Sequence, residues 1–293
     1  MEKYYWDNKI EYLEETRKTW FNYDYIEFLI QSVWKINKPE SIADFGCGNG
    51  FLASVLMPRL PKGSTYTGYD KGEGLIENAQ KLFSKAPFDV EFIHCDLIKE
   101  EITKKYDLVI CQAFLMHIPE PEHMLRKMID AVKSNGLVIC IETNWNVANA
   151  AMYIDGLDVD GQCNLGILQK LWMNEKEELK TDKCIGMKIP CIMQEQGLKD
   201  ISIRMNDCVR FANPYGDSDD YIEVRNTLLA DGWGHDMDDR GNYIKNLCSR
   251  GVTLKEAELQ YNCEKEINEF VKTNKDNIMM LTIPPMFISY GRK

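Results

Sequence analysis

The order of apolar and polar positions predicts a helical start followed by alternating strands and helices. From residue 7 to 36 apolar side chains recur at three- and four-residue steps, the period of an amphipathic helix, and Pro39 ends that region. Short apolar runs and segments of helical spacing then alternate, which indicates a doubly wound α/β fold with a mostly parallel sheet. The expected strands are 42–45, 65–69, 90–94, 108–111 and 137–141, and the expected helices are 51–60, 75–83 and 121–133.

The second half of the chain is less regular. Helical spacing covers residues 167–179, and apolar runs at 201–211 and 286–290 bring the expected sheet to seven strands. Residues 214–278, between those two strands, are rich in Asp, Asn and Glu with helical periodicity, so we interpret them as a helical insertion forming a lid. The expected parts are an N-terminal helical cap 1–38, an α/β core 39–213, the lid 214–278 and the last core strand 279–293.

Composition narrows the classes of function. The 293 residues include 35 Lys and Arg against 46 Asp and Glu, a formal net charge of −11, which repels nucleic-acid phosphates and anionic lipid. No run approaches the ~20 apolar residues that cross a bilayer, and the start shows no export signal. Ten cysteines without a CxxC pair favour reduced thiols. We therefore expect a cytoplasmic protein with neither a nucleic-acid nor a membrane partner.

A glycine-rich turn follows the first expected strand and opens a helix. It reads Asp44-Phe45-Gly46-Cys47-Gly48-Asn49-Gly50. Glycine lets the backbone turn tightly and approach a ligand closely. A dinucleotide fingerprint would place its third glycine at position 51, where this chain has Phe51, so the spacing is wrong for NAD. The pattern D-x-G-x-G-x-G instead resembles motif I of the class I S-adenosylmethionine-dependent methyltransferases. A plain strand-to-helix turn is the alternative.

Further motifs follow in order between about residues 40 and 142. Asp70 ends the second strand about twenty residues past the glycines, where a carboxylate can accept both ribose hydroxyls. Asp96 ends the third strand, and residues 106–119 and 131–139 resemble the family's fourth motif and fifth strand. The usual Pro-Gly-Gly turn is replaced by Ser134-Asn135-Gly136. The resemblance implies a Rossmann-like fold and, overall, the branch that includes quinone-biosynthesis methyltransferases.

The resemblance also implies a binding site for S-adenosylmethionine. Asp44 would orient the methionine part, Asp70 would bind the ribose, and Asp96 with Leu97 would face the adenine; an ordinary helix-capping role is the alternative for the acids. Arg17 and Tyr25 could fold over the cofactor as caps do in similar proteins, or could serve surface charge and packing. The remaining expected contacts are Gly46, Cys47, Gly48, Asn49, Gly50, Lys71, Gln112 and Ala113.

Methyl transfer from a sulfonium requires a nucleophile in line with the S–CH3 bond, and proximity alone can supply up to ~7–11 kcal/mol. A general base near the end of the fourth or fifth strand would help, and the candidates are His117 and Glu142. His117 matches a histidine common in the family's small-molecule members, but a histidine that fixes the loop before Pro119 is equally compatible. For Glu142 a strand-end hydrogen-bond acceptor is the favoured interpretation.

Three other segments invite a functional interpretation. Residues 155–161 and 235–239 are acidic but lack the ligand spacing of a metal site, so we expect solvated loops and no metal. Pro284 and Pro285 are expected to open the last strand. The sequence thus predicts a methyltransferase that acts on a small-molecule acceptor by in-line displacement. A nucleic-acid methyltransferase and a non-catalytic cofactor-binding regulator are the alternatives, and neither the acceptor nor the oligomeric state follows from the sequence.

Overall fold

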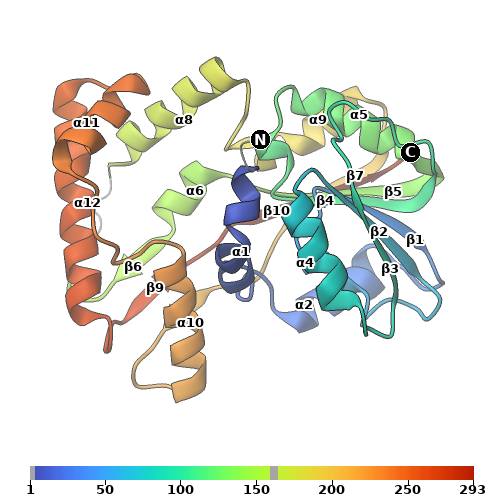
Figure 1. Ribbon diagram of the computed structural model, residues 1–293, viewed down its shortest axis with the longest axis horizontal. Coiled ribbons are helices and arrows are strands. Elements are labelled where there is room, and N and C mark those ends of the chain that lie inside the picture. Colours follow the sequence, from blue (N-terminus) through green and yellow to red (C-terminus); the bar gives the residue numbers. More distant parts are fainter. Residues whose placement is uncertain (1–3, 159–163) are drawn as a thin grey trace.

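The computed structural model describes residues 4–158 and 164–293. Figure 1 shows two lobes with helix α1 (Ile10–Thr16) between them. The larger lobe is built on the main sheet. The smaller lobe, which we define as residues 145–179 and 206–285 where described, carries most of the remaining helices.

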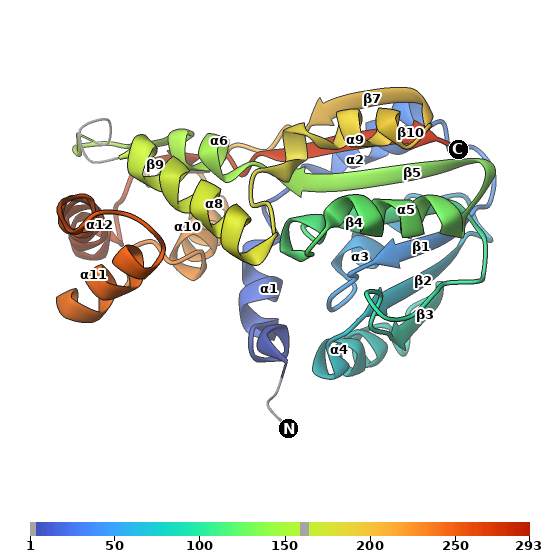
Figure 2. The ribbon, with the colours of Figure 1, turned by 90° about the horizontal axis from the view of Figure 1, so that it is seen from above.

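The main sheet has seven strands in the order β3-β2-β1-β4-β5-β10-β7, which Figure 2 shows from end to end. Five strands are parallel: β1 (Ser41–Phe45), β2 (Thr65–Asp70), β3 (Asp89–His94), β4 (Tyr106–Gln112) and β5 (Val132–Thr143). Strand β10 (Met286–Arg292) is antiparallel to β5 and to β7 (Lys199–Met205). The predicted seven-stranded, mostly parallel fold is confirmed. The carboxyl ends of the parallel strands meet at one edge, where a ligand is expected.

Helices cover both faces of this sheet. Those on one face are α2 (Tyr23–Phe28), α3 (Phe51–Leu56) and α4 (Glu73–Phe83), and those on the other are α5 (Pro121–Ala131) and α9 (Ile189–Glu195). In β4, Leu108 and Ile110 enter the first core, whereas Val109 and Cys111 enter the second, because successive strand side chains point to opposite faces. Burial on both faces explains the continuous apolar runs that marked these strands in the sequence.

Residues 7–36, expected to be helical, do not form one helix. The chain forms separate pieces, namely η1 (Tyr5–Asn8), α1, α2 and the π-helical η2 (Leu29–Val33). Asn22 has an extended backbone, and its side chain donates to Asp207, so a new helix begins at the following residue. The break separates α1, which lies between the lobes, from α2, which packs on the sheet.

The smaller lobe draws on two stretches of chain. Its three-stranded sheet has the order β6-β9-β8, from β6 (Met152–Ile154), β9 (Met280–Thr282) and β8 (Arg210–Ala212). The expected lid, residues 214–278, contains α10 (Ser218–Ala230), α11 (Arg240–Ser249) and α12 (Leu254–Asn274). However, α6 (Trp145–Ala150), β6 and α8 (Leu165–Leu179) precede it in the sequence. The single strand expected at 201–211 is divided between β7 and β8, which belong to different sheets.

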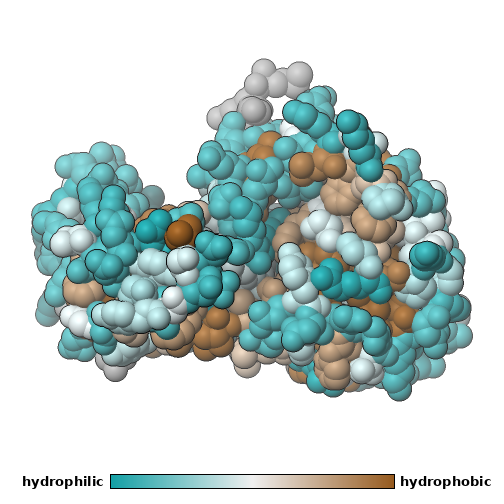
Figure 3. Space-filling model, turned by 90° about the horizontal axis from the view of Figure 1, so that it is seen from below, coloured by the Kyte–Doolittle hydropathy of each residue, from teal (hydrophilic) through white to brown (hydrophobic). Residues whose placement is uncertain are grey.

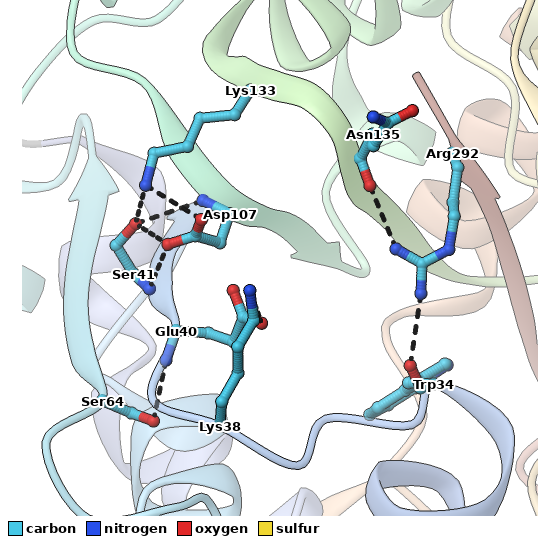
Figure 4. Close-up of polar contacts among 9 residues, drawn as sticks. All are labelled: Trp34, Lys38, Glu40, Ser41, Ser64, Asp107, Lys133, Asn135 and Arg292. Carbon is cyan, nitrogen blue, oxygen red and sulfur yellow. Dashed lines mark hydrogen bonds and ion pairs between the residues drawn. The ribbon is translucent and has the colours of Figure 1, made fainter.

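A polar cluster fixes the opposite, amino edge of the main sheet (Figure 4). The Ser41 amide and hydroxyl donate to Asp107 Oδ2 at 2.9 and 2.6 Å, and Lys133 Nζ lies 2.9 Å from Asp107 Oδ1. Burial raises the pKa of Asp107, but Ser41 and Lys133 outweigh burial and lower the pKa to about 2. Arg292 donates to the carbonyl of Asn135 at 3.1 Å nearby. These groups satisfy one another, so the cluster stabilises strand register.

Candidate functional site

The carboxyl edge of the main sheet opens into a cavity of about 880 Å³, within the range of ~300–1,000 Å³ typical of ligand sites. The N-terminal segment, the loops after β1 to β4 and the smaller lobe all contribute to its walls. Figure 3 shows the surface indented between the two lobes. Of the predicted site residues, all line this cavity except Asp44, Cys47, Asn49, Gly50, Gln112 and Tyr25.

The glycine loop brings bare backbone to the cavity wall. The Gly46 amide donates to the carbonyl of Tyr69 at 2.8 Å, which ties the end of β1 to the end of β2. Gly46, Gly48 and Gly50 have φ of +76°, +55° and +87°, in the left-handed region that favours glycine. A Cβ on Gly46 would lie 2.2 Å from the ring of Phe114. No larger residue fits there without displacing that ring.

Asp70 ends β2 and binds the glycine loop with its carboxylate. Its Oδ2 accepts from the Gly48 amide at 2.9 Å and its Oδ1 from the Gly72 amide at 2.8 Å. Burial raises the pKa of Asp70, and these two hydrogen bonds together with Arg17 oppose that rise. Each carboxylate oxygen can accept a further bond. Because Asp70 also lines the cavity, it can accept from ligand hydroxyls.

Asp7, which the sequence analysis missed, attaches the N-terminal segment beside Asp70. Its Oδ1 accepts from the Leu75 amide, in the first turn of α4, at 3.2 Å, and a Cβ on Gly72 would lie 2.7 Å from this oxygen. The neighbouring Trp6 ring meets the His117 ring edge-on at 5.1 Å. The N-terminal segment therefore contacts two sides of the cavity.

Arg17, just past the end of α1, brings an uncompensated cation to the cavity. Its guanidinium lies 5.3 Å from the Trp20 ring, and its Nε has no hydrogen-bond partner. Among the described residues no carboxylate oxygen lies within 4 Å of it. A Cβ on Gly48 would be 3.4 Å from Arg17 Nη1, which places the guanidinium next to the glycine loop. Burial lowers the pKa of Arg17, while Tyr12, Asp44 and Asp70 raise it. Such a group fits a ligand carboxylate.

An ion pair and apolar side chains form the wall after β3. Asp96 Oδ2 lies 3.2 Å from Lys71 Nζ and 3.5 Å from Lys99 Nζ. Burial raises the pKa of Asp96, but Lys71 and the Ile98 amide outweigh it, so the pKa is lowered. Leu97 beside it is buried. An apolar wall with a polar rim suits a planar heterocycle.

His117 is held by a lysine that the sequence analysis did not single out. Its Nδ1 lies 2.9 Å from Lys183 Nζ, and a charged lysine only donates, so Nδ1 accepts and the ring proton lies on Nε2. Burial, then Lys183 and Arg17, lower the pKa of His117 to about 3. A neutral His117 with Nδ1 occupied is a hydrogen-bond donor. The arrangement supports the positioning alternative over the general base.

Glu142, at the end of β5, organises the loop that carries His117. Its carboxylate accepts from the amides of Phe114, Leu115 and Met116 at 3.0, 2.7 and 3.3 Å. Its side chain is fully buried, and burial raises its pKa to about 7 against those three bonds. Glu142 therefore acts as the strand-end acceptor that the sequence favoured and fixes the 113–117 loop.

Five predicted residues lie behind the cavity wall. Asp44 is 1% exposed; its Oδ2 accepts from the Tyr66 hydroxyl, its Oδ1 has no partner, and burial raises its pKa to about 7. Gln112 is buried with Nε2 unpartnered. The others, within the glycine loop, are buried: Cys47, Asn49 and Gly50. Asp44 and Gln112 thus retain hydrogen-bonding capacity close behind the wall.

Tyr25 was predicted to cap the site, and the structure places it elsewhere. Its hydroxyl donates to the carbonyl of Met205 at 2.9 Å, and its ring stacks on Phe28 with centroids 5.9 Å apart. Met205 ends β7, an edge strand of the sheet, so this prediction is wrong. The break after Arg17 separates Tyr25 from the helix that reaches the cavity.

The acidic segments that could suggest a metal site form no cluster of metal ligands among their described residues. Among residues 4–158 and 164–293 no three His, Cys, Asp or Glu side chains are placed to bind a metal ion. Residues 159–161 of the acidic segment 155–161 lie outside the described residues. Pro284 and Pro285 precede β10, as expected, and also line the cavity. No helix in the described part of the chain is long and apolar enough to cross a membrane.

Comparisons with known proteins agree on one family. Residues 36–227 match the family described as "Methyltransferase domain". A ubiquinone biosynthesis O-methyltransferase of Pseudomonas entomophila (strain L48) is 33% identical over 109 residues, which make up 36% of this chain and 46% of that protein. This chain therefore spans about half the length of the curated relatives it matches.

Two solved structures share the fold. Phosphoethanolamine N-methyltransferase 2 of Haemonchus contortus, with phosphomonomethylethanolamine and S-adenosylhomocysteine, has a TM-score of 0.52 at 14% identity, covering 99% of this chain and 58% of that one. An S-adenosylmethionine-dependent methyltransferase of Geobacter sulfurreducens, with S-adenosylhomocysteine, has a TM-score of 0.50 at 10% identity, covering 99% and 98%. At these identities the likeness concerns the fold alone.

Proposed function

We propose that this chain, which belongs to the methyltransferase-domain family, binds S-adenosylmethionine and transfers its methyl group to a small-molecule acceptor. The family match confirms the resemblance predicted from the glycine loop and the strand-end acids. The observation that carries the proposal is the arrangement of Asp70 between the Gly48 and Gly72 amides, at the edge of a cavity that Arg17 also lines.

The described residues fit this cofactor by their chemistry. Asp70 would accept the ribose hydroxyls. Arg17, which among the described residues has no carboxylate oxygen within 4 Å and an unpartnered Nε, would face the carboxylate of the methionine part. Lys71, Asp96 and Leu97 would border the adenine. The loop at Gly46 and Gly48 would give backbone contact without side-chain obstruction.

When bound, the cofactor supplies a methyl group on a sulfonium, an electrophile that needs only a nucleophile in line with it. The chain's part is then orientation and exclusion of water. Glu142 fixes the 113–117 loop, and Lys183 fixes the tautomer of His117, so that His117 Nε2 can donate to a bound group. The smaller lobe forms the part of the cavity wall where the acceptor would bind.

A small-molecule acceptor is supported by the cavity's limited volume and by the net charge of −11, which disfavours nucleic acid. The names of the ubiquinone biosynthesis O-methyltransferase and of the phosphoethanolamine N-methyltransferase indicate that those two enzymes act on small molecules. A cytoplasmic location belongs to the proposal and is supported by the nine cysteines that are free among the described residues.

Incubation with methyl-labelled S-adenosylmethionine and a metabolite extract tests the proposal. We expect label in a low-molecular-weight product, and less label with the Asp70→Asn protein at the same subsaturating cofactor concentration. Cofactor binding without any labelled product would favour a non-catalytic regulator. Label confined to added RNA would favour a nucleic-acid methyltransferase. Absence of cofactor binding would refute the proposal.

A further inference from the structure

One face of α12 forms a polar wall of the cavity in the smaller lobe. Gln260, Glu264, Ile267 and Asn268 all line the cavity and recur at the three- and four-residue steps that place side chains on one side of a helix. Three of these four side chains are polar. This wall is separate from the glycine loop and from the strand-end acids, which lie in the larger lobe.

The polar groups of this wall include a hydrogen-bond acceptor that has no partner. Asn268 is satisfied, since its Oδ1 accepts from the Gly234 amide and its Nδ2 donates to the carbonyl of Glu264. Gln260 Nε2 donates to Glu264 Oε1 at 2.7 Å. Gln260 Oε1 has no partner, although this residue is only 3% exposed. A buried acceptor without a partner in the protein indicates that a bound ligand donates to it.

Glu264 is also uncompensated in charge. Of the described residues, no lysine, arginine or histidine nitrogen lies within 4 Å of its carboxylate, whereas Arg210 pairs with Asp231 and Lys71 pairs with Asp96 elsewhere on the cavity wall. The remaining unpaired cation there, Arg17, is accounted for by the proposed cofactor. Glu264 therefore adds to the smaller lobe's wall of the cavity a negative charge that no described lysine, arginine or histidine pairs with.

Aromatic side chains also contribute to the smaller lobe's wall of the cavity. Trp145 and Trp233 line the cavity, and Trp233 belongs to the loop that the Gly234 amide attaches to Asn268. Aromatic faces attract cations, and their apolar area suits a hydrocarbon body. A carboxylate, an amide oxygen and aromatic rings together match a protonated amine on an apolar body, and they disfavour a carboxylate or phosphate.

We propose that the methyl acceptor carries a protonated amine whose N–H groups are bound by Glu264 and Gln260. This inference rests on the proposed function and adds the substrate class. The affinity of the protein for an amine can be measured without any methyl transfer.

The test uses three matched probes with the full-length protein saturated with S-adenosylhomocysteine. These are 2-phenylethylamine, 2-phenylethanol and 3-phenylpropanoate, titrated by ligand-observed NMR. We expect the amine to bind about tenfold to a hundredfold more tightly than the alcohol, and the carboxylate to bind most weakly. Glu264→Gln should bring the amine to the level of the alcohol. Glu266→Gln, at an exposed position of the same helix, should leave the preference unchanged.

Unchanged affinity for S-adenosylhomocysteine shows that each variant is folded. If Glu264→Gln does not fold, Gln260→Met provides the second test, because it removes the unpartnered oxygen while keeping side-chain length; it should weaken the amine severalfold. Equal binding of amine and alcohol by the wild type, or a preference that survives in both variants, overturns the inference alone. If the wild-type protein does not bind S-adenosylhomocysteine at all, the proposed function is refuted, and the inference with it.

Discussion

Replacing Asp70 by Asn tests the cofactor site with the least change in shape. In the wild type both carboxylate oxygens accept from backbone amides, Gly48 at 2.9 Å and Gly72 at 2.8 Å. The variant has one oxygen and one NH2 group. The NH2 group must either face one of those two backbone amides, with which it cannot form a hydrogen bond because both groups are donors, or turn away from it. The bound ligand also loses a charged acceptor.

The magnitude follows from the bonds involved. Loss of a hydrogen bond to a charged group costs about 1.5–3 kcal/mol, which weakens S-adenosylhomocysteine binding roughly tenfold to 150-fold. The orphaned backbone amide lowers the free energy of unfolding by a further ~1–3 kcal/mol. Binding must therefore be measured well below the Tm of the variant.

Isothermal titration calorimetry of S-adenosylhomocysteine checks this expectation. Asp89→Asn is the matched control, since Asp89 is an exposed acid at the start of β3, away from the cavity. A wild-type Kd for Asp70→Asn, with a wild-type Tm, would show that neither the glycine loop nor the ligand depends on this carboxylate.

Two further predictions concern protonation. Asp107 has a pKa of about 2 in the folded protein, below its usual ~3.9, so its stabilisation is present above the unfolded pKa and is lost as pH falls through the folded one. Asp107→Asn should therefore lower the free energy of unfolding at pH 6 more than at pH 2.5, and equal losses in denaturant titrations would contradict this. Lys183→Met should raise the pKa of His117 from about 3 toward its usual value, because Lys183 lowers it. NMR titration of the His117 ring measures the shift, with the exposed Lys180→Met as control, and an unchanged pKa would count against the contact.

The sequence predicted the elements that local patterns encode. Apolar runs marked β1, β2, β4 and β5 because these strands are largely buried on both faces, and glycine spacing marked the turn after β1. Asp70 was found because it follows directly from a strand end. Each of these signals lies within a few consecutive residues.

The residues that sequence reasoning missed act through distant partners. Asp7 contacts Leu75, 68 positions away, and Lys183 contacts His117, 66 positions away. Nothing next to them in the sequence announces such contacts. Tyr25 was misplaced for the same reason, since the break near Asn22 depends on a contact with Asp207.

The change of sheet after β7 was missed as well. Asn206, in the middle of the apolar stretch 201–211, donates to the carbonyl of Pro284 and accepts from the Met286 amide. These bonds hold the point where the chain leaves the main sheet for β8. A single asparagine gives no strand-ending signal by itself.

The central position of β9 has a practical consequence for protein engineering. This strand pairs with β6 from the first stretch and β8 from the second, and it leads directly through the two prolines into β10. A chimaera that receives only residues 214–278 would therefore lack all three strands of the smaller sheet as well as α6 and α8. Both pieces must be grafted together for a new host to inherit the smaller lobe's wall of the cavity.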